Sequence, residues 1–471
     1  MTSYGAARRW RLAALAVPVC AVALSGALMA QTAPPFKSLR YDENYEYLRN
    51  VERRTSRLDA LKFIPLRADG SSYLSLGGEV RERFELIHHV AWGSGPRDDD
   101  GYLLQRYMLH ADLHFGESLR IFTQLKSGLE EGREGGPRPT DRDSIDLHQA
   151  FIDWSPSGFS TSPLTLRVGR QELAYGSSRL ISNRDGPNVR LSFDGVKVVL
   201  RSRGWQVHAF TMRPVRTHAG AWDDDGDQNE LLWGVYASAP SEWMRGVNTE
   251  FYYLGVHRDQ ARFDQGSAEE RRHSLGARIS RRNAGWDYNL EAVYQFGTFG
   301  PGNIRAWTLA SDWGFQFNER KLKPRLGLKA DVTSGDKNRD VPDLQTFNPL
   351  FPRGAYFGEP ALVGPANHID IHPSVSLDFG AGFALDLGWD RFWRESAADG
   401  IYGPSVNVLR SGVASSARNV GDQIEAKLDW SINRNLGIGA DYAHFFASRF
   451  LAQTGTGKDI DYMSVWATLR F

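Results

Sequence analysis

The feature that most constrains the fold of this chain is a regular alternation of apolar and polar residues. In WDYNLEAVYQFGT, residues 286–298, every second side chain from Trp286 to Phe296 is apolar or aromatic, and most of those between are polar. A period of two is typical of a β-strand with one apolar and one polar face. The same alternation recurs in residues 325–333 and 422–430.

The length of these runs separates two classes of β protein. They reach roughly 9 to 15 residues, whereas strands in soluble proteins are usually about 5–6 residues long and tilted strands that cross a bilayer need about 9–11. The polar face also carries many ionised groups, which a dry core does not tolerate but a water-filled lumen does. The pattern therefore predicts an all-β fold, a transmembrane antiparallel barrel of bacterial outer-membrane type.

About eighteen segments fit this pattern, within two, and an even number is typical of bacterial single-chain barrels. Their predicted spans are 72–88, 101–115, 119–130, 145–155, 163–172, 192–202, 204–213, 230–239, 245–257, 270–282, 284–297, 304–317, 322–334, 369–380, 382–395, 418–430, 435–447 and 459–471. Short connections fall at 116–118, 202–204 and 433–435, and long polar ones near 88–100, 130–144, 172–191, 213–229, 334–368 and 395–417. This asymmetry predicts short periplasmic turns and long external loops.

The first thirty residues have the pattern of a secretory signal peptide, with arginines at positions 8, 9 and 11 before an apolar run that ends in small residues at Ala30. An uncleaved membrane anchor is the alternative. The predicted organisation is a signal peptide at 1–30, an N-terminal periplasmic segment at 31–71 and a barrel at 72–471, located in the outer membrane. Because the single cysteine, Cys20, lies in the signal peptide, the exported chain would contain no disulfide.

The final segment, DYMSVWATLRF at 461–471, alternates in the same way. Met463, Val465, Leu469 and Phe471 share one face, and Trp466 interrupts the polar face. Phe471 resembles the C-terminal aromatic residue of outer-membrane proteins that the barrel assembly machinery reads. That machinery, outer-membrane lipid and lipopolysaccharide are therefore expected partners.

Several segments, taken together and in order, resemble the bacterial alginate export family of outer-membrane porins. They are LRYDENYEYLRN (39–50), YLSLGGEVRERFE (73–85), DLHQAFIDW (146–154), LTLRVGRQELAYGSSRLI (164–181), NVRLSFDGVKV (188–198), VTSGDKNRD (332–340), TFNPLFPRGAYFG (346–358), WRESAADGIYGP (393–404), VGDQIEAKLDW (420–430) and YAHFFASRFL (442–451). The resemblance implies a monomeric barrel of about 18 strands with a positively charged, constricted lumen. The family's namesake passes an anionic polyuronate outward.

Basic residues are the candidate substrate ligands. Of the 56 Lys and Arg residues, 10 are Lys and 46 are Arg, and Arg binds a carboxylate through two parallel hydrogen bonds. Alternation of faces predicts lumen-facing, substrate-binding side chains at Arg81, Arg83, Glu85, Arg106, Arg120, Lys126, Arg167, Asp390 and Arg394. The alternative is that these groups only pair with acidic neighbours inside a wide barrel. The long loop at 334–368 is the candidate for folding into or over the pore.

Cofactor and catalytic signatures are weak. DDDGD at 223–227 has the character of a calcium loop, so Asp223, Asp225 and Asp227 are a possible calcium site, but an exposed acidic loop is the default interpretation. No other cofactor is expected. The sequence contains no HExxH, no GxSxG and no cysteine nucleophile, and an enzyme is therefore not expected.

Three functions remain open at this stage. The first is a passive channel for an anionic polysaccharide or oligosaccharide. The second is a substrate-specific porin for small organic anions or sugars, and the remote third is a barrel enzyme or a structural surface protein. The expected partners of the first are an anionic saccharide and periplasmic export components. Nucleic acid is not an expected partner.

Overall fold

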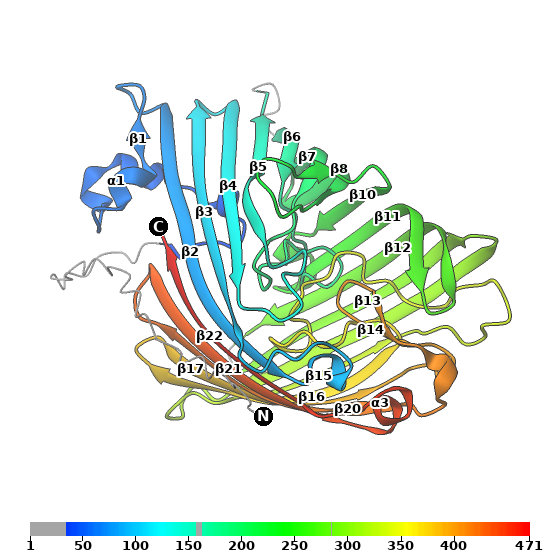
Figure 1. Cartoon of the computed structure of the whole chain (residues 1–471). Coiled ribbons are helices and arrows are strands. Elements are labelled where there is room, and N and C mark those ends of the chain that lie inside the picture. Colours follow the sequence, from blue (N-terminus) through cyan, green and yellow to red (C-terminus); the bar gives the residue numbers. More distant parts are fainter. Residues whose placement is uncertain (1–33, 157–162, 284) are drawn as a thin grey trace, which may run out of the picture. The chain divides into compact units, whose positions relative to one another are not determined.

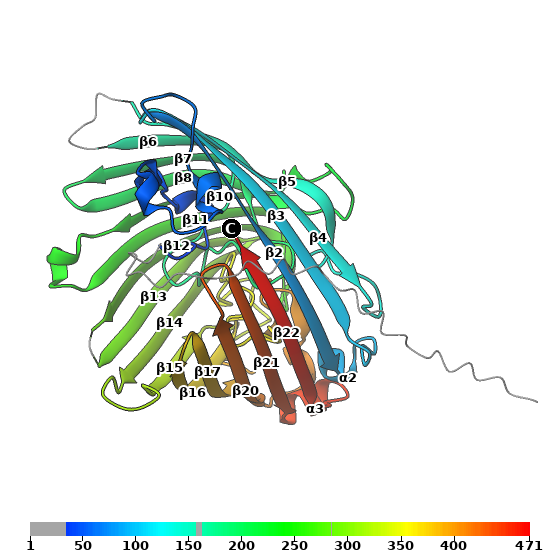
Figure 2. The same cartoon turned by 90° about the vertical axis from the view of Figure 1, so that its left-hand side faces the viewer.

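The alternating faces of the sequence become the two surfaces of a closed sheet. In the computed structural model, which describes residues 34–156, 163–283 and 285–471, eighteen antiparallel strands form a barrel (Figure 1). Figure 2 shows the closure, where β2 (Ser72–His88) lies beside β22 (Ile460–Arg470), with Val80 opposite Leu469. Within the described part of the chain, each barrel strand pairs with a neighbour on both sides, which is what a bilayer requires. The predicted fold class is confirmed.

The strands lie close to their predicted spans. The others of the barrel are β3 (Tyr102–Phe115), β4 (Leu119–Glu131), β5 (Asp143–Trp154), β6 (Leu164–Gln171), β7 (Phe193–Ser202), β8 (Trp205–Arg216), β10 (Glu230–Ser238), β11 (Asn248–Phe263), β12 (Gly266–Arg282), β13 (Trp286–Phe299), β14 (Gly302–Gln316), β15 (Arg325–Thr333), β16 (His368–Gly380), β17 (Phe383–Trp393), β20 (Asn419–Ser431) and β21 (Leu436–Ala447). The largest difference is at β11 and β12, which extend into a tight hairpin.

Minor elements decorate the ends of the barrel. They are the short strands β1 (Ile64–Pro65), β9 (Asp225–Gly226), β18 (Ile401–Tyr402) and β19 (Val408–Arg410), the helices α1 (Asp59–Lys62), α2 (Val90–Gly93) and α3 (Arg449–Thr454), and the 3-10 segments η1 (Arg40–Asp42), η2 (Glu46–Arg49), η3 (Val51–Arg53), η5 (Ser241–Met244) and η6 (Gly412–Ala414). Among the described residues, no helix is long and apolar enough to cross a membrane.

The outer surface of the barrel is apolar around its circumference. Exposed aliphatic side chains on neighbouring strands include Val168, Val196, Val235, Leu275, Leu309, Leu328, Ile371, Leu387, Ile424 and Val465. Exposed aromatic side chains gather near the end with the short turns, among them Trp154, Trp286, Phe379 and Trp430. An apolar band bordered by aromatic residues is the surface that a lipid bilayer covers.

Three segments enter the lumen. The loop at 334–367 folds inward, as predicted, and reaches the barrel wall where Asn348 Nδ2 donates to Glu270 Oε1 at 3.1 Å. The loop at 172–192, predicted to be external, also folds inward. The two loops pair where the Phe351 amide donates to the Leu180 carbonyl at 2.8 Å.

The third inward segment is part of the N-terminal segment, residues 35–71, where the Tyr41 hydroxyl donates to the Glu172 carbonyl at 2.7 Å. Apolar contacts hold the two loops in place. Leu180, Ile181, Leu344, Phe347, Leu350 and Phe351 are buried in one cluster with inward side chains of the strands. Alternation alone predicted a polar lumen. The lumen also contains an apolar core, which the two loops form with inward side chains of the strands.

Candidate permeation site

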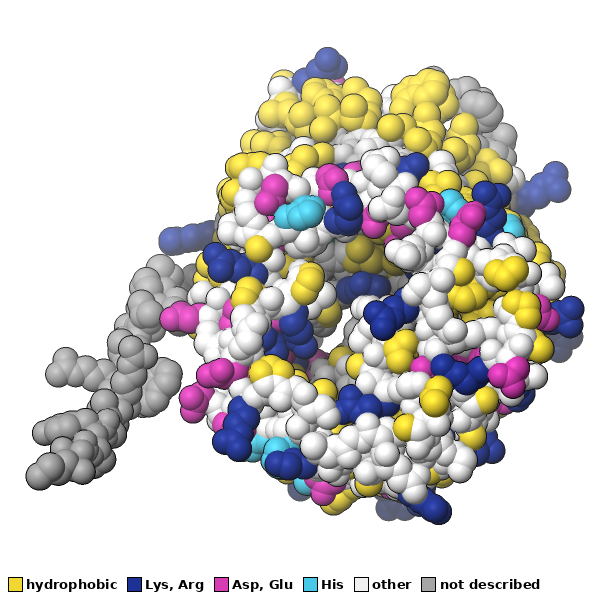
Figure 3. All heavy atoms as spheres, turned by 45° about the vertical axis from the view of Figure 1, so that its right-hand side comes forward, with side chains coloured by type: hydrophobic (Ala, Val, Ile, Leu, Met, Phe, Trp, Pro, Cys, Tyr) yellow, Lys and Arg dark blue, Asp and Glu magenta, His cyan; other side chains and the backbone are white. Residues whose placement is uncertain are grey.

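A cavity of about 450 Å³ in the lumen, here called the central chamber, gathers most of the predicted arginines of the first strands. Its basic lining residues are Arg81, Arg83, Arg106, Arg353, Lys427 and Arg470, and its acidic ones are Asp185, Glu359 and Asp429. Six cations thus face three carboxylates. Figure 3 shows the molecule hollowed near its centre, with Lys and Arg side chains around the hollow.

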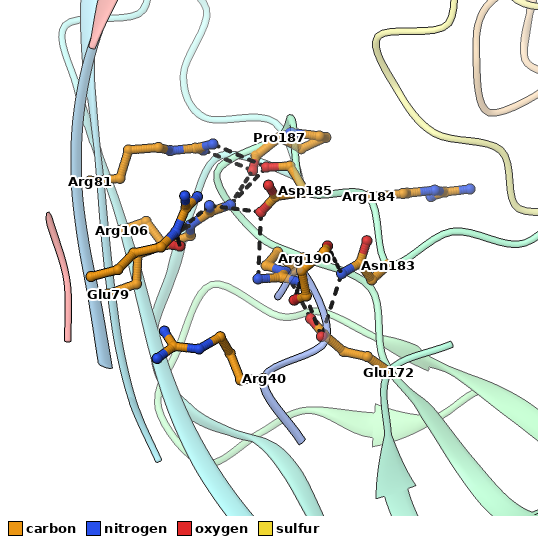
Figure 4. Close-up of polar contacts among 12 residues, drawn as sticks. Arg40, Glu79, Arg81, Arg106, Glu172, Asn183, Arg184, Asp185, Pro187 and Arg190 are labelled. Atoms are coloured by element: carbon orange, nitrogen blue, oxygen red, sulfur yellow. Dashed lines mark hydrogen bonds and ion pairs between the residues drawn. The ribbon is translucent and has the colours of Figure 1, made fainter. Parts of the chain in front are cut away.

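Two arginines of the wall hold the loop at 172–192 (Figure 4). Arg81 of β2 donates to the carbonyl oxygens of Asp185 at 3.0 Å and Pro187 at 2.9 Å. Arg106 of β3 donates to the same two oxygens at 2.8 and 3.1 Å. Arg106 also binds the Asp185 carboxylate at 2.9 Å and Glu79 at 2.8 Å. Both side chains point into the lumen, where alternation placed them.

Arg190 completes the cluster from the loop itself. It lies 2.8 Å from Glu172 and 3.5 Å from the Asp185 carboxylate. Desolvation inside the barrel would raise the pKa of Asp185, but Arg190, Arg106 and Arg81 together hold it well below its usual range. Asp185 is therefore ionised at neutral pH.

A second cluster forms around Arg83 of β2. Its guanidinium lies 3.1 Å from Glu359 of the loop at 334–367 and 2.7 Å from Glu85, and Lys427 of β20 binds Glu359 at 2.8 Å. Trp466 of β22 lies beneath both cations, with its ring 5.1 Å from Arg83 and 5.5 Å from Lys427. The tryptophan that interrupts the polar face of the last strand thus faces the chamber.

The other predicted lumen residues lie outside the central chamber and are paired with other groups of the protein. Arg120 binds Asp112 at 2.7 Å and Arg167 binds Asp153 at 2.6 Å. Both line a separate cavity of about 540 Å³ beside the N-terminal segment. Asp390 of β17 accepts a bond from His372 at 3.0 Å.

Arg394 is not a lumen-facing strand residue. The strand β17 ends at Trp393, because its pairing with β20 shifts register after Phe392. Arg394 is fully buried in the following loop, where it donates to the carbonyl oxygens of Ala397, Asp399, Ser415 and Ala417. This side chain fastens the loop between β17 and β20.

The acidic stretch at 223–227 adopts an arrangement that its sequence does not suggest. Asp225 lies in β9 and binds Arg216 of β8 at 2.8 Å, whereas its neighbour Asp224 turns inward. The described residues bring together Asp143, Asp146 and Asp224, whose ligand atoms all lie within 4.8 Å of one another. Asp223, Asp225 and Asp227 do not form this group.

A lysine already sits within that carboxylate group. Lys126 Nζ lies 2.7 Å from Asp143 and 2.7 Å from Asp224. The ammonium therefore supplies the positive charge that an acidic group of this kind requires.

Several residues of the central chamber escaped the sequence prediction. Lys427 and Arg470 lie on the polar faces of their strands, so alternation could have identified them. Asp185, Arg353 and Glu359 come from loops, where no periodicity indicates a direction. Their place in the lumen depends on how the loops fold.

Several solved structures from Pseudomonas aeruginosa have the same fold. OccK3 (OpdO) superposes with a TM-score of 0.55 at 12% identity over 84% of this chain and 95% of that one. OccK8 (OprE) gives 0.56 at 11% over 84% and 98%, and OpdK, solved with vanillate, gives 0.55 at 14% over 84% and 98%. At these identities the likeness concerns the fold. A search of curated proteins gives no match.

The sequence itself carries the family assignment. The sequence model described as "Alginate export" matches residues 72–465, which include seventeen complete barrel strands and part of the last. With the closed barrel and the arginine-lined lumen, this match shows that the chain belongs to the alginate export family of outer-membrane channels.

Proposed function

We propose that this channel passes an anionic polysaccharide or oligosaccharide by diffusion through the central chamber. The observation that carries the proposal is the excess of six cations over three carboxylates in that chamber. Guanidinium groups stay charged and match the geometry of carboxylates, and rings of cationic side chains favour anions in a pore. The Trp466 ring adds an apolar surface beside these charges.

The second candidate is a porin for small organic anions or sugars. The inward loops favour this second candidate, because they divide the lumen into small cavities. Two of these, of about 450 Å³ and 350 Å³, are both lined by Arg353 and Lys427. OpdK, which has the same fold, was solved with vanillate, a small aromatic anion. The two candidates differ in whether a chain of several sugars fits past the loops.

Several expectations belong to the same proposal. The protein is a monomer and not an enzyme, it is exported by a signal peptide at 1–30, and it contacts lipopolysaccharide, the barrel assembly machinery and periplasmic export components. The short turns then face the periplasm and the long loops face outward. The signal peptide lies outside the described residues.

Single-channel recording in a planar bilayer tests the proposal. The expected result is a reversal potential that reports anion selectivity, together with current block by uronate oligomers and none by neutral oligomers of equal length. Cation selectivity without uronate block would overturn it. Block by monomeric organic anions, but not by oligomers, would favour the second candidate.

A further inference from the structure

Two of the three carboxylates in the central chamber come from the inward loops, not from the barrel wall. Asp185 of the loop at 172–192 lies 2.9 Å from Arg106 and 3.5 Å from Arg190. Glu359 of the loop at 334–367 lies 3.1 Å from Arg83 and 2.8 Å from Lys427. Each loop therefore delivers one carboxylate to a pair of cations.

These two carboxylates change the charge of the chamber lining. Without them Asp429 would be the one carboxylate among the described lining residues, although Glu79 would still bind Arg106 and Arg470, and Glu85 would still bind Arg83. The Asp185 side chain is 43% exposed and that of Glu359 is 15% exposed. Both are therefore within reach of a molecule in the lumen, although they bind buried arginines.

Each loop is also anchored by contacts that do not involve these side-chain carboxylates. Arg81 and Arg106 hold the first loop through backbone carbonyls, and Asn188 Nδ2 lies 2.8–3.0 Å from three more, those of Gln105, Leu129 and Asp141. The second loop is fastened around Glu359 by its own backbone, since the Glu359 amide donates to Glu425 at 3.0 Å and Gln423 donates to the Phe357 carbonyl at 2.9 Å. The side-chain carboxylates are left with an electrostatic role.

We propose that Asp185 and Glu359 are built-in counter-ions that exchange with the carboxylates of the passing substrate. This inference rests on the proposed function. Asp185 lies at Arg106 and Arg190, and Glu359 lies at Arg83 and Lys427. Substrate carboxylates take these two positions during passage. Permeation requires binding strong enough for entry and weak enough for release. With only Glu79, Glu85 and Asp429 of the wall beside its cations, the chamber would hold a polyanion too tightly, and the competing loop carboxylates weaken that binding.

The test measures block of single-channel current by uronate oligomers in Asp185→Asn, Glu359→Gln and the double variant. Removing each competitor is expected to tighten uronate binding about tenfold, which corresponds to about 1.4 kcal/mol, and to lengthen each blocking event in proportion. Neutral oligomers should be unaffected. The matched controls are Asp225→Asn, on an outer loop, and Asp340→Asn, an exposed acid on the same loop as Glu359; both should behave as wild type.

Asp185→Glu separates charge from loop position. This variant keeps the carboxylate, so we expect it to bind uronate oligomers with wild-type affinity. If Asp185→Glu bound them as tightly as Asp185→Asn, disturbance of the loop would explain the change in affinity, and the proposal would be overturned. Unchanged or weaker uronate binding in both neutral variants would also overturn it. A wild-type channel that uronates never block would instead refute the proposed function, which keeps the two failures distinct.

Discussion

Arg40 donates hydrogen bonds to the carbonyl oxygens of Phe471, at 2.8 Å, and Gly78, at 3.1 Å. Gly78 and Phe471 also bond to each other through their backbones, at 2.9 and 3.1 Å. One arginine of the N-terminal segment thus caps the point where the first barrel strand meets the end of the last. The N-terminal segment and the closure of the barrel are therefore coupled.

Arg40→Ala is expected to weaken this closure. A hydrogen bond from a charged group contributes about 1.5–3 kcal/mol to stability. Because Arg40 is buried, water would not fully replace the hydrogen bonds that the variant loses. The measurement is the temperature at which the barrel loses its compact migration on a gel. Arg57→Ala, an exposed arginine of the same segment, is the control, and an equal decrease in both variants would contradict a specific role for Arg40.

Lys62 should make docking of the N-terminal segment pH-dependent. Its ammonium is buried among the rings of Phe36, Tyr45 and Phe471, at 5.0–6.0 Å. Burial, and then Arg40, lowers its pKa to about 7. A base with a lowered folded-state pKa destabilises while it is charged, so stability rises as the pH increases above 7 and levels off near the unfolded pKa.

Raising the pH from 6 to 8.5 is therefore expected to stabilise the docked segment by about 2 kcal/mol. Protease resistance of residues 35–71 reports this change. Lys62→Met keeps the apolar stem without the charge, so its segment should resist protease equally at both pH values. A pH response that persists in Lys62→Met would assign the effect to another group.

Phe351→Ala is expected to loosen both inward loops. Its ring is buried, packs edge-on against Phe193 at 5.2 Å, and lies where the two loops pair. Truncating a buried Phe to Ala costs about 3–5 kcal/mol. Single-channel conductance should increase and become noisier as the loops move away from the lumen. The control is Val341→Ala, on an exposed part of the same loop, which should leave conductance unchanged. Unchanged conductance in Phe351→Ala would show that the loops do not restrict the pore.

Lys126→Met is expected to destabilise the barrel by about 3–5 kcal/mol, because it leaves buried carboxylates without a counter-charge. Asp143 is fully buried and Asp146 is nearly so. Calcium at millimolar concentration should restore part of the loss, since oxygen-rich groups bind this ion. The measurement is the unfolding temperature with and without calcium. Stabilisation of the wild type by calcium would contradict the view that Lys126 fills this role.

The barrel and the inward direction of its arginines could be predicted because both depend on local geometry. A strand turns successive side chains to opposite faces, so Arg81, Arg83, Arg106, Arg120 and Arg167 point inward wherever their strands lie. The prediction was wrong for Arg394, since the end of a strand depends on its partner's register. It did not give the inward direction of the loop at 172–192, because no periodicity indicates where a loop folds.

The alternation of residues was enough to predict strands with an apolar outer face and a polar inner face that carries arginines, since successive side chains of a strand point to opposite faces. The tertiary structure decided which arginines meet in one chamber and what neutralises them. Asp185 and Arg106 are 79 residues apart, and Glu359 and Arg83 are 276 apart. No local pattern encodes such pairs, because they form only when the apolar contacts of two loops draw them into the lumen.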